Sequence, residues 1–212
     1  MWDAQYSHPF IRGIADGTLA EDRFGFWLRQ DYLFLIQYCR VLGVAAARSP
    51  NLATLAKFSE LLAATATTEM TMHREYAAAF GITASELERS EIAPTTRAYT
   101  DFLLRSATVD DFAVLVAALL PCMWGFADLG VRLKADEDRS STRYATWIAA
   151  YSAPEFVAMA DWCRQLLDEL ANGAKPELLG QMAEAFETSS RYELWFWDMA
   201  WYQEQTRLQV QA

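Results

Sequence analysis

Three polar residues lie in apolar stretches of the sequence, and their types suit covalent and acid–base chemistry. Asp31 is the one acid in the apolar run 24–44, Cys122 follows Pro121 in another apolar stretch, and Glu193 is surrounded by aromatic residues and leucine. An unpaired buried carboxylate is costly, so Asp31 needs a partner or a function. A desolvated glutamic acid favours its protonated form and can donate a proton. A cysteine thiolate is a nucleophile.

Each of these residues also has an interpretation without chemistry. Periodicity alone allows Asp31 to face solvent, a cysteine such as Cys122 in an apolar helix is usually inert packing, and Glu193 can be a buried hydrogen-bonding residue. Cys39 and Cys163 are interpreted as packing residues. Three widely spaced cysteines fit neither a disulfide framework nor a zinc site, so we expect free thiols in a reducing, cytoplasmic environment.

Each of the three polar residues lies one helical turn from an aromatic residue, which places both members of a pair on one helix face. The pairs are Asp31 with Phe34, Cys122 with Phe126, and Glu193 with Phe196. Three helices can therefore each bring a polar group and a ring to one cavity. Ring faces stack on a flat heterocycle and carboxylates bind its amino groups, so the pattern predicts a heterocycle site.

Other chemistries are less well supported. Glu69, His73 and Glu75 have a spacing that metals use, but the chain has one other histidine, His8, placed before the first predicted helix. His73 is therefore interpreted as a helix-surface or packing residue, and we expect no metal. The sequence contains no nucleotide-binding glycine loop and no GxSxG. A net charge of −10 argues against a nucleic acid or an anionic membrane as partner.

The elements that must position these residues are predicted to be helices throughout. Apolar residues recur at spacings of three and four, and no segment alternates with a period of two. Local signals predict helices at about 19–48, 50–80, 95–106, 108–136, 142–151, 154–172 and 176–205. The second of these has a predicted N-cap at Ser49 and a stop at Gly81. The segments between and after the helices include a polar turn at 83–91, a charged loop at 136–141 and a polar tail after Tyr202. Pro121 is expected to kink its helix.

The pattern as a whole predicts one all-α domain over 1–212, a bundle of about eight helices joined by short loops. No apolar run approaches the roughly 20 residues that span a bilayer, and the N-terminus lacks the features of a signal peptide.

A set of short sequences is more specific than these patterns because its order and spacing are also distinctive. The set comprises His8-Pro9-Phe10, Asp16-Gly17-Thr18-Leu19, Gln30-Asp31, Glu69-Met70 with His73-Arg74-Glu75, Leu119-Leu120-Pro121-Cys122 followed by Trp124, and Ser189-Ser190-x-Tyr192-Glu193 with Phe196-Trp197. From His8 to about Tyr202, the chain resembles the TenA family, the thiaminase II group of the haem-oxygenase-like fold, in its cysteine-containing branch.

The resemblance implies a hydrolase of thiamin salvage that forms 4-amino-5-hydroxymethyl-2-methylpyrimidine from aminopyrimidines or thiamin, without a cofactor. Cys122 matches the nucleophile that adds to the ring, and Glu193 matches the acid that assists the leaving group. Asp31 matches the carboxylate that holds the pyrimidine, while Tyr99 and Tyr151 match pocket tyrosines. The resemblance also implies a homo-oligomer, a tetramer or a dimer, that acts on a small molecule.

Two residues depart from the family pattern. Phe34 and Phe126 stand where the family commonly has tyrosine, so each keeps the ring and loses the hydroxyl. The resemblance implies that the hydroxyl missing at Phe34 helps to activate Cys122, and that the one missing at Phe126 contacts the substrate. The alternative is therefore a protein that binds a pyrimidine or another heterocycle with weak or no hydrolysis. A haem enzyme or oxidase on the same fold is a third possibility, which the scarcity of histidine disfavours.

Overall fold

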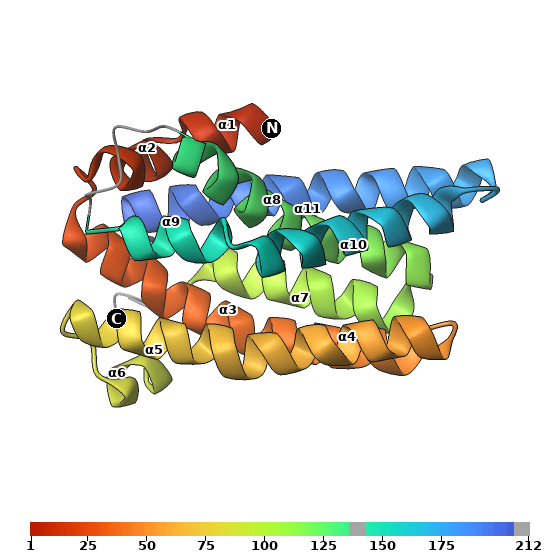
Figure 1. Ribbon diagram of the computed structural model, residues 1–212, viewed down its shortest axis with the longest axis horizontal. Helices are drawn as coiled ribbons and strands as arrows, with labels where there is room; N and C mark the ends of the chain where they lie inside the picture. Colours follow the sequence, from red (N-terminus) through yellow and green to blue (C-terminus); the bar gives the residue numbers. More distant parts are fainter. Residues whose placement is uncertain (136–142, 206–212) are drawn as a thin grey trace, which may run out of the picture. The chain divides into compact units, whose positions relative to one another are not determined.

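A computed structural model of the chain describes residues 1–135 and 143–205, and the regular elements within those residues are all helices (Figure 1). The chain divides into two compact units, which are described in turn. Unit 1 comprises Met1–Leu19 and Arg105–Trp197, and unit 2 comprises Ala20–Leu104 and Asp198–Ala212. The predicted helical class is confirmed for the described residues, whereas one domain over 1–212 stays a prediction.

The helices are distributed over both units. Unit 1 holds α1 (Trp2–Ser7), α2 (Pro9–Asp16), α8 (Phe112–Ala135), α9 (Ala145–Tyr151) and α10 (Pro154–Ala171). Unit 2 holds α3 (Glu21–Arg48), α4 (Leu52–Ala64), the π-helical turn η1 (Thr65–Glu69), α5 (Met70–Ala79) and α6 (Ala84–Glu88). Helices α7 (Pro94–Val109) and α11 (Pro176–Tyr202) contribute residues to both.

Helix α3 is the central helix of unit 2. It contacts α4, η1, α5 and α6, and α4, η1 and α5 follow one another alongside it (Figure 1). The spacing of three and four residues in this segment predicts one buried helix face, and the structure confirms it, because all five residues of that face are buried: Phe24, Trp27, Leu28, Asp31 and Leu35. Full burial of one large apolar side chain contributes about 1.5–3 kcal/mol, so this face is a main source of the unit's stability.

A buried glutamine ties the segment before α7 to α3. Nε2 of Gln30 donates to the carbonyl of Glu91 at 2.9 Å. Its Oε1 accepts from the backbone N–H of Ala93 at 2.9 Å and from the hydroxyl of Thr96 at 3.0 Å. One side chain thus satisfies the backbone N–H of the buried Ala93 and also holds the carbonyl of Glu91.

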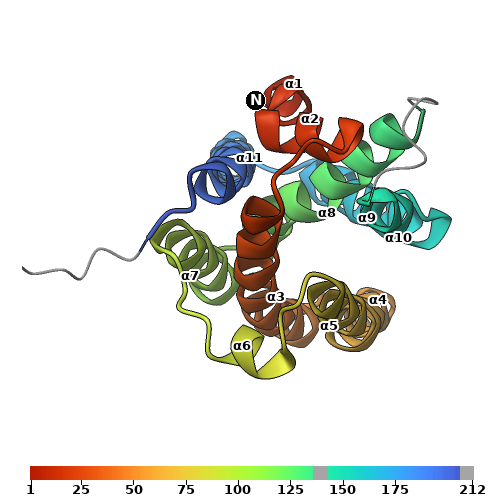
Figure 2. The same ribbon diagram turned by 90° about the vertical axis from the view of Figure 1, so that its left-hand side faces the viewer.

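The predicted polar turn 83–91 contains the short helix α6, which lies beside α3 and α5 (Figure 2). Thr83 and Glu86 form a reciprocal capping box at its start. The box satisfies two backbone donors. Its pattern, a threonine followed three residues later by a glutamate, is visible in the sequence, but a segment this short and polar was predicted to be a turn.

Helix α8 is the core helix of unit 1 and contacts α9 and α10. By length and composition it is apolar enough to cross a membrane, which corrects the expectation that no run approaches that length. However, 83% of its most apolar window is buried inside the fold. A helix that is apolar on all sides must be covered by protein or lipid, and here protein covers it. Pro121 lies within α8, and the predicted kink stays a prediction.

The prediction that the first helix starts near residue 19 is wrong, because α1 and α2 precede it. Helix α2 begins with Pro9 in its first turn, and Nδ1 of His8 accepts from the backbone N–H of Phe10 at 3.1 Å. Histidine is not among the usual capping residues, so the standard signal at this start was Pro9 at the first helical position.

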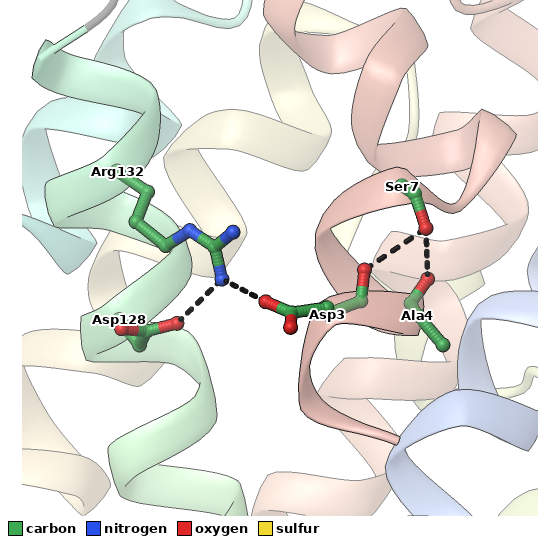
Figure 3. Close-up of polar contacts among 5 residues, drawn as sticks. All are labelled: Asp3, Ala4, Ser7, Asp128 and Arg132. Carbon is green, nitrogen blue, oxygen red and sulfur yellow. Dashed lines mark hydrogen bonds and ion pairs between the residues drawn. The ribbon is translucent and has the colours of Figure 1, made fainter.

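Helix α1 is bound to α8 by a surface arginine (Figure 3). Nη1 of Arg132 donates to Oδ1 of Asp3 at 3.2 Å and to Oδ2 of Asp128 at 3.4 Å. The guanidinium also lies 4.0 Å from the centroid of the Tyr6 ring. Exposed ion pairs of this kind contribute at most about 1 kcal/mol each, so they orient α1 more than they stabilise the fold.

Most predicted helix boundaries are correct. Helix α10 begins at Pro154 and is followed by Asn172-Gly173, and Gly81 adopts φ +75° just after α5. The N-cap predicted at Ser49 is wrong, because the side chain of Asn51 caps α4. The predicted loop 136–141, the first residue of the predicted helix 142–151 and residues 206–212 of the predicted tail lie outside the described residues.

Candidate functional site

The predicted site residues fall into two sets, one in each unit. Unit 2 contains Asp31, Phe34 and Tyr99, and unit 1 contains Cys122, Phe126, Tyr151, Glu193 and Phe196. Cys122 is partly buried, and the other seven are buried. The two sets are described separately, and their convergence on one cavity stays a prediction.

Asp31 has a partner that sequence patterns did not predict. Oδ2 of Asp31 lies 2.5 Å from Nε2 of His73 on α5, and both residues are buried. The other ring nitrogen of His73, Nδ1, lies 3.1 Å from the carbonyl oxygen of Glu69 at the end of η1. The interpretations of Asp31 as solvent-facing and of His73 as a helix-surface residue are therefore wrong.

The electrostatics of this pair favour a charged imidazole. Burial lowers the pKa of His73, but the hydrogen bond and charge of Asp31, together with the charge and carbonyl of Glu69, raise that pKa by more, so the net pKa lies above the usual 6.5. The sequence did contain a signal for this pair. A buried acid requires a partner, and the chain has only two histidines that could serve as one.

Two predicted aromatic residues meet in unit 2. The ring of Phe34 lies 5.1 Å from that of Tyr99 on α7, and 5.7 Å from that of Tyr38, which is stacked on it one turn later along α3. These separations are typical of favourable aromatic pairs. Phe34 and Tyr99 thus form a ring wall within the unit that also holds Asp31.

A second aromatic cluster lies in unit 1, and it unites two more predicted residues. Phe126 lies 4.8 Å from Tyr151 and 5.3 Å from Trp197, and Trp147 lies 4.9 Å from Tyr151 (ring centroids). Sequence patterns missed Trp147 and Trp197 as members. Their positions in the sequence pointed to this cluster. Trp147 precedes Tyr151 by four positions, which places the two rings on one face of α9, and Trp197 follows the candidate Phe196 directly.

A glycine allows α9 to approach α8 closely. A Cβ atom at Gly130 would lie 2.5 Å from the carbonyl carbon of Tyr151 and 2.7 Å from the backbone nitrogen of Ser152. Real Cβ atoms essentially never come so near to backbone. Gly130 therefore sets the position of Tyr151 against α8 and, with it, the packing of Tyr151 on Phe126.

The structure gives the burial of Cys122 and Glu193, whereas their roles in catalysis stay predictions. Cys122 is partly buried on α8, next to Pro121, and Glu193 on α11 is only 2% exposed. The predicted desolvation of Glu193 is therefore confirmed, and its role as an acid stays a prediction.

The other two cysteines fit the packing interpretation. Cys163 is fully buried, its Sγ lies 3.6 Å from the Met123 sulfur, and burial raises its pKa to about 12. Cys39 is partly buried, and burial together with the charge of Glu69 raises its pKa. Neither thiol is readily ionised, which fits a packing residue better than a nucleophile.

Within residues 1–135 and 143–205, no group of three or more His, Cys, Asp or Glu side chains is placed to hold a metal ion. The sequence grouping of Glu69, His73 and Glu75 does not form such a group, because both ring nitrogens of His73 are engaged by Asp31 and by the Glu69 carbonyl.

Comparison with known proteins decides the family. The model of the TENA/THI-4/PQQC family matches residues 1–203. The chain belongs to this family. An aminopyrimidine aminohydrolase from Halalkalibacterium halodurans is 43% identical to this family member over 202 residues, which cover 95% of this chain and 90% of that protein.

Solved structures agree with this assignment. A TenA family transcription regulator from Silicibacter sp. TM1040 superposes with a TM-score of 0.87 and 30% identity, covering 94% of this chain and 90% of that one. A Shewanella denitrificans domain described as having a heme oxygenase-like fold superposes with a TM-score of 0.76 at 15% identity, covering 96% and 88% of the two chains. The predicted all-α, haem-oxygenase-like fold is confirmed.

Proposed function

We propose that this family member is an aminopyrimidine aminohydrolase of thiamin salvage. It converts 4-amino-5-aminomethyl-2-methylpyrimidine (aminomethylpyrimidine) and water into 4-amino-5-hydroxymethyl-2-methylpyrimidine (hydroxymethylpyrimidine) and ammonia. The observation that carries the proposal is 43% identity over 95% of the chain with a relative named for that activity. The chain also contains the residue types that such a reaction requires, in Cys122, Glu193 and Asp31.

The proposed steps balance without a cofactor. The thiolate of Cys122 adds to the pyrimidine ring, which makes the amine of the aminomethyl group easier to expel. The C–N bond breaks as Glu193 gives its proton to the departing amine. Water then adds to the exocyclic carbon and returns a proton to Glu193, and the S–C bond breaks to restore the thiolate. Asp31 accepts an N–H from the amino group that stays on the ring.

The physical setting of the side chains supports these roles. Glu193 carries a carboxyl group, which can donate a proton, and it is nearly fully buried. Each unit contains a pair of aromatic residues of the kind that stacks on a flat heterocycle, Phe34 with Tyr99 in unit 2 and Phe126 with Tyr151 in unit 1. Cys122 is the least buried of the predicted site residues, as a reactive thiol should be.

A second candidate function is binding of a pyrimidine or another heterocycle with weak or no hydrolysis. The observation that favours it is phenylalanine at positions 34 and 126, where the family commonly has tyrosine. Stacking survives this change, whereas activation of the thiol and orientation of the ligand lose a hydroxyl.

Incubation of the purified protein with aminomethylpyrimidine, and separately with thiamin, separates the two candidates. The proposal expects hydroxymethylpyrimidine and an equal amount of ammonia from the first substrate, over many turnovers per protein chain. Binding of hydroxymethylpyrimidine without release of product from either substrate would replace the proposal with the second candidate.

We further propose that the protein acts in the cytoplasm as a homo-oligomer, a tetramer or a dimer. Two considerations support this: Cys39 and Cys163 are unpaired thiols, which a reducing compartment preserves, and the resemblance to the family implies an oligomer. Light scattering coupled to size exclusion tests the assembly, and a mass near 24.0 kDa, that of one chain, would contradict it.

A further inference from the structure

The protons shared by Asp31 and His73 can be counted from the geometry. Nδ1 of His73 faces the carbonyl oxygen of Glu69 at 3.1 Å, and a carbonyl oxygen only accepts, so Nδ1 carries a hydrogen. Nε2 lies 2.5 Å from Oδ2 of Asp31, and one further proton joins these two atoms. With that proton in place the carboxyl and the imidazole have a net charge of zero.

The surroundings keep this proton in place. The side chains of His73 and Asp31 are 2% and 6% exposed, and the ring of Trp27 lies 5.8 Å from that of His73. Burial acts against the charged imidazole, but Asp31 and Glu69 outweigh it and raise the pKa of His73. The hydrogen bond and the neighbouring charges therefore favour the imidazolium form of His73.

The neighbouring elements offer few other groups that act on this equilibrium. The titratable and charged side chains on the elements packed around His73 belong to four elements, and they are, on α3, Glu21, Asp22, Arg23, Arg29, Asp31, Tyr32, Tyr38, Cys39, Arg40 and Arg48; on η1, Glu69; on α5, Arg74, Glu75 and Tyr76; and on α6, Glu86 and Glu88. Among the described residues, Asp31 and Glu69 are those whose charges shift the pKa of His73.

The irregular turn η1 explains why the third partner is a backbone carbonyl. The π-helical turn ends at Glu69, and α5 begins at the next residue. His73 lies four positions after Glu69, so its ring reaches back to the carbonyl at this junction. Single π-helical turns within regular helices are frequent at functional sites, and here the carbonyl at the end of the turn contacts the imidazole.

We propose that His73 is the positioning residue for Asp31 in the aminopyrimidine site, an inference that rests on the proposed function. Its bond to Oδ2 fixes the rotation of the carboxylate and leaves Oδ1 to accept an N–H from the amino group of the pyrimidine ring. The imidazolium also balances the carboxylate, so a neutral amino-heterocycle binds without leaving a buried charge unpaired. His73 acts through Asp31 and touches no reacting atom.

This arrangement predicts a pH dependence for ligand binding. Below the raised pKa of His73, Nε2 donates to Asp31 and affinity is constant. Above it, the imidazole is neutral and keeps one hydrogen. The charge of Asp31 is then unbalanced, and one ring nitrogen faces an oxygen, of Asp31 or of Glu69, with no hydrogen between them, so the pair holds the carboxylate less firmly. Affinity therefore falls as pH rises through that pKa.

Two substitutions of His73 separate the donor from the charge. His73→Phe keeps a flat ring and removes both N–H groups, whereas His73→Gln supplies an amide N–H that does not titrate. His8→Asn is the matched control, since His8 is the second histidine of the chain and its side chain caps α2. Asn keeps an acceptor for that cap.

Binding is measured by calorimetry with hydroxymethylpyrimidine between about pH 5.5 and 9, and turnover with aminomethylpyrimidine. We expect His73→Phe to weaken binding and raise KM at least about tenfold with kcat within about threefold, because one hydrogen bond to a charged group is lost. His73→Gln should bind within about threefold of the natural protein at pH 7 and lose the decline at high pH. Unchanged binding in His73→Phe, or a decline that persists in His73→Gln, overturns the proposal.

A spectroscopic measurement tests the pair without any activity and without a variant that must fold. In protein with 15N-labelled histidine, NMR should show one imidazole with hydrogens on both nitrogens at pH 7, assigned to His73. His8 should differ, because its Nδ1 accepts a hydrogen bond. A His73 ring that is neutral at pH 6.5, or lacks a hydrogen on Nδ1, overturns the proposal.

Failure of the proposed function has a different signature. In that case the natural protein neither hydrolyses aminomethylpyrimidine nor binds hydroxymethylpyrimidine, while the NMR signals of the pair are as expected. Failure of the positioning role alone leaves hydrolysis intact and insensitive to His73→Phe.

Discussion

Substitution of Gly130 by alanine should displace Tyr151 and destabilise the fold. The added Cβ would meet the carbonyl carbon of Tyr151 at 2.5 Å, whereas ordinary van der Waals contact begins at 3.4 Å. The difference, 3.4 − 2.5 = 0.9 Å, is the distance by which α9 must move away from α8. The obstacle is backbone, so no flexible side chain can relieve it.

The magnitude follows from two opposing effects. Overpacking of this kind costs about 1–3 kcal/mol, and we take the upper value because backbone must move. Replacing glycine by alanine inside a helix returns about 1 kcal/mol. The net loss is about 2 kcal/mol, which lowers Tm by about 4–8 °C for a chain of this size. Since Tyr151 moves with α9, the Kd for hydroxymethylpyrimidine should also rise about tenfold.

Gly180→Ala is the matched control, because Gly180 lies inside α11 with nothing within 4 Å of an added Cβ. It should raise Tm by about 2–4 °C and leave Kd unchanged. Thermal unfolding and calorimetry on both variants provide the comparison. If Gly130→Ala keeps the Tm and the Kd of the natural protein, then α9 is not held as described and Tyr151 does not belong to the site.

Three further changes test other parts of the structure. Gln30→Leu leaves the buried backbone N–H of Ala93 without its partner and should cost about 2 kcal/mol in urea unfolding; an unchanged midpoint would contradict the role given to Gln30. The raised pKa of His73 makes its contribution to stability complete below about pH 6.5 and lost as pH rises through the folded-state pKa. The urea midpoint should therefore fall between about pH 6 and 9 in the natural protein and stay level in His73→Gln. If the midpoint depends on pH equally in both proteins, His73 is not the group responsible. Phe34→Tyr should speed hydrolysis about ten- to a hundredfold at constant pyrimidine affinity, and a rate that does not rise shows that the hydroxyl comes from elsewhere or is not needed.

The helices were largely predictable because their signals are local. Pro154 starts α10, Gly81 follows α5 with a positive φ, and the buried positions of α3 repeat at three and four residues. Each signal concerns residues within a few turns of one another, which a single sequence displays directly.

The remaining features depend on contacts that no local pattern displays. Asp31 and His73 are 42 positions apart and meet because α5 packs against α3. The orientation of helix α1 similarly depends on the contact of Asp3 with Arg132, which lies more than a hundred residues further along the chain. The apolar composition of α8 has the same origin, since most of that helix is buried inside the fold. Sequence patterns identified the candidate residues, and the structure added the partner of Asp31.

The central claim is hydrolysis of an aminopyrimidine through Cys122, and the most direct test compares the natural protein with Cys122→Ser. Product formation from aminomethylpyrimidine is followed in both, with binding of hydroxymethylpyrimidine measured in parallel. We predict that the natural protein releases hydroxymethylpyrimidine and ammonia in equal amounts, and that Cys122→Ser binds the product with similar affinity but forms none. Turnover by Cys122→Ser at the natural rate, or no turnover by the natural protein, would contradict the account.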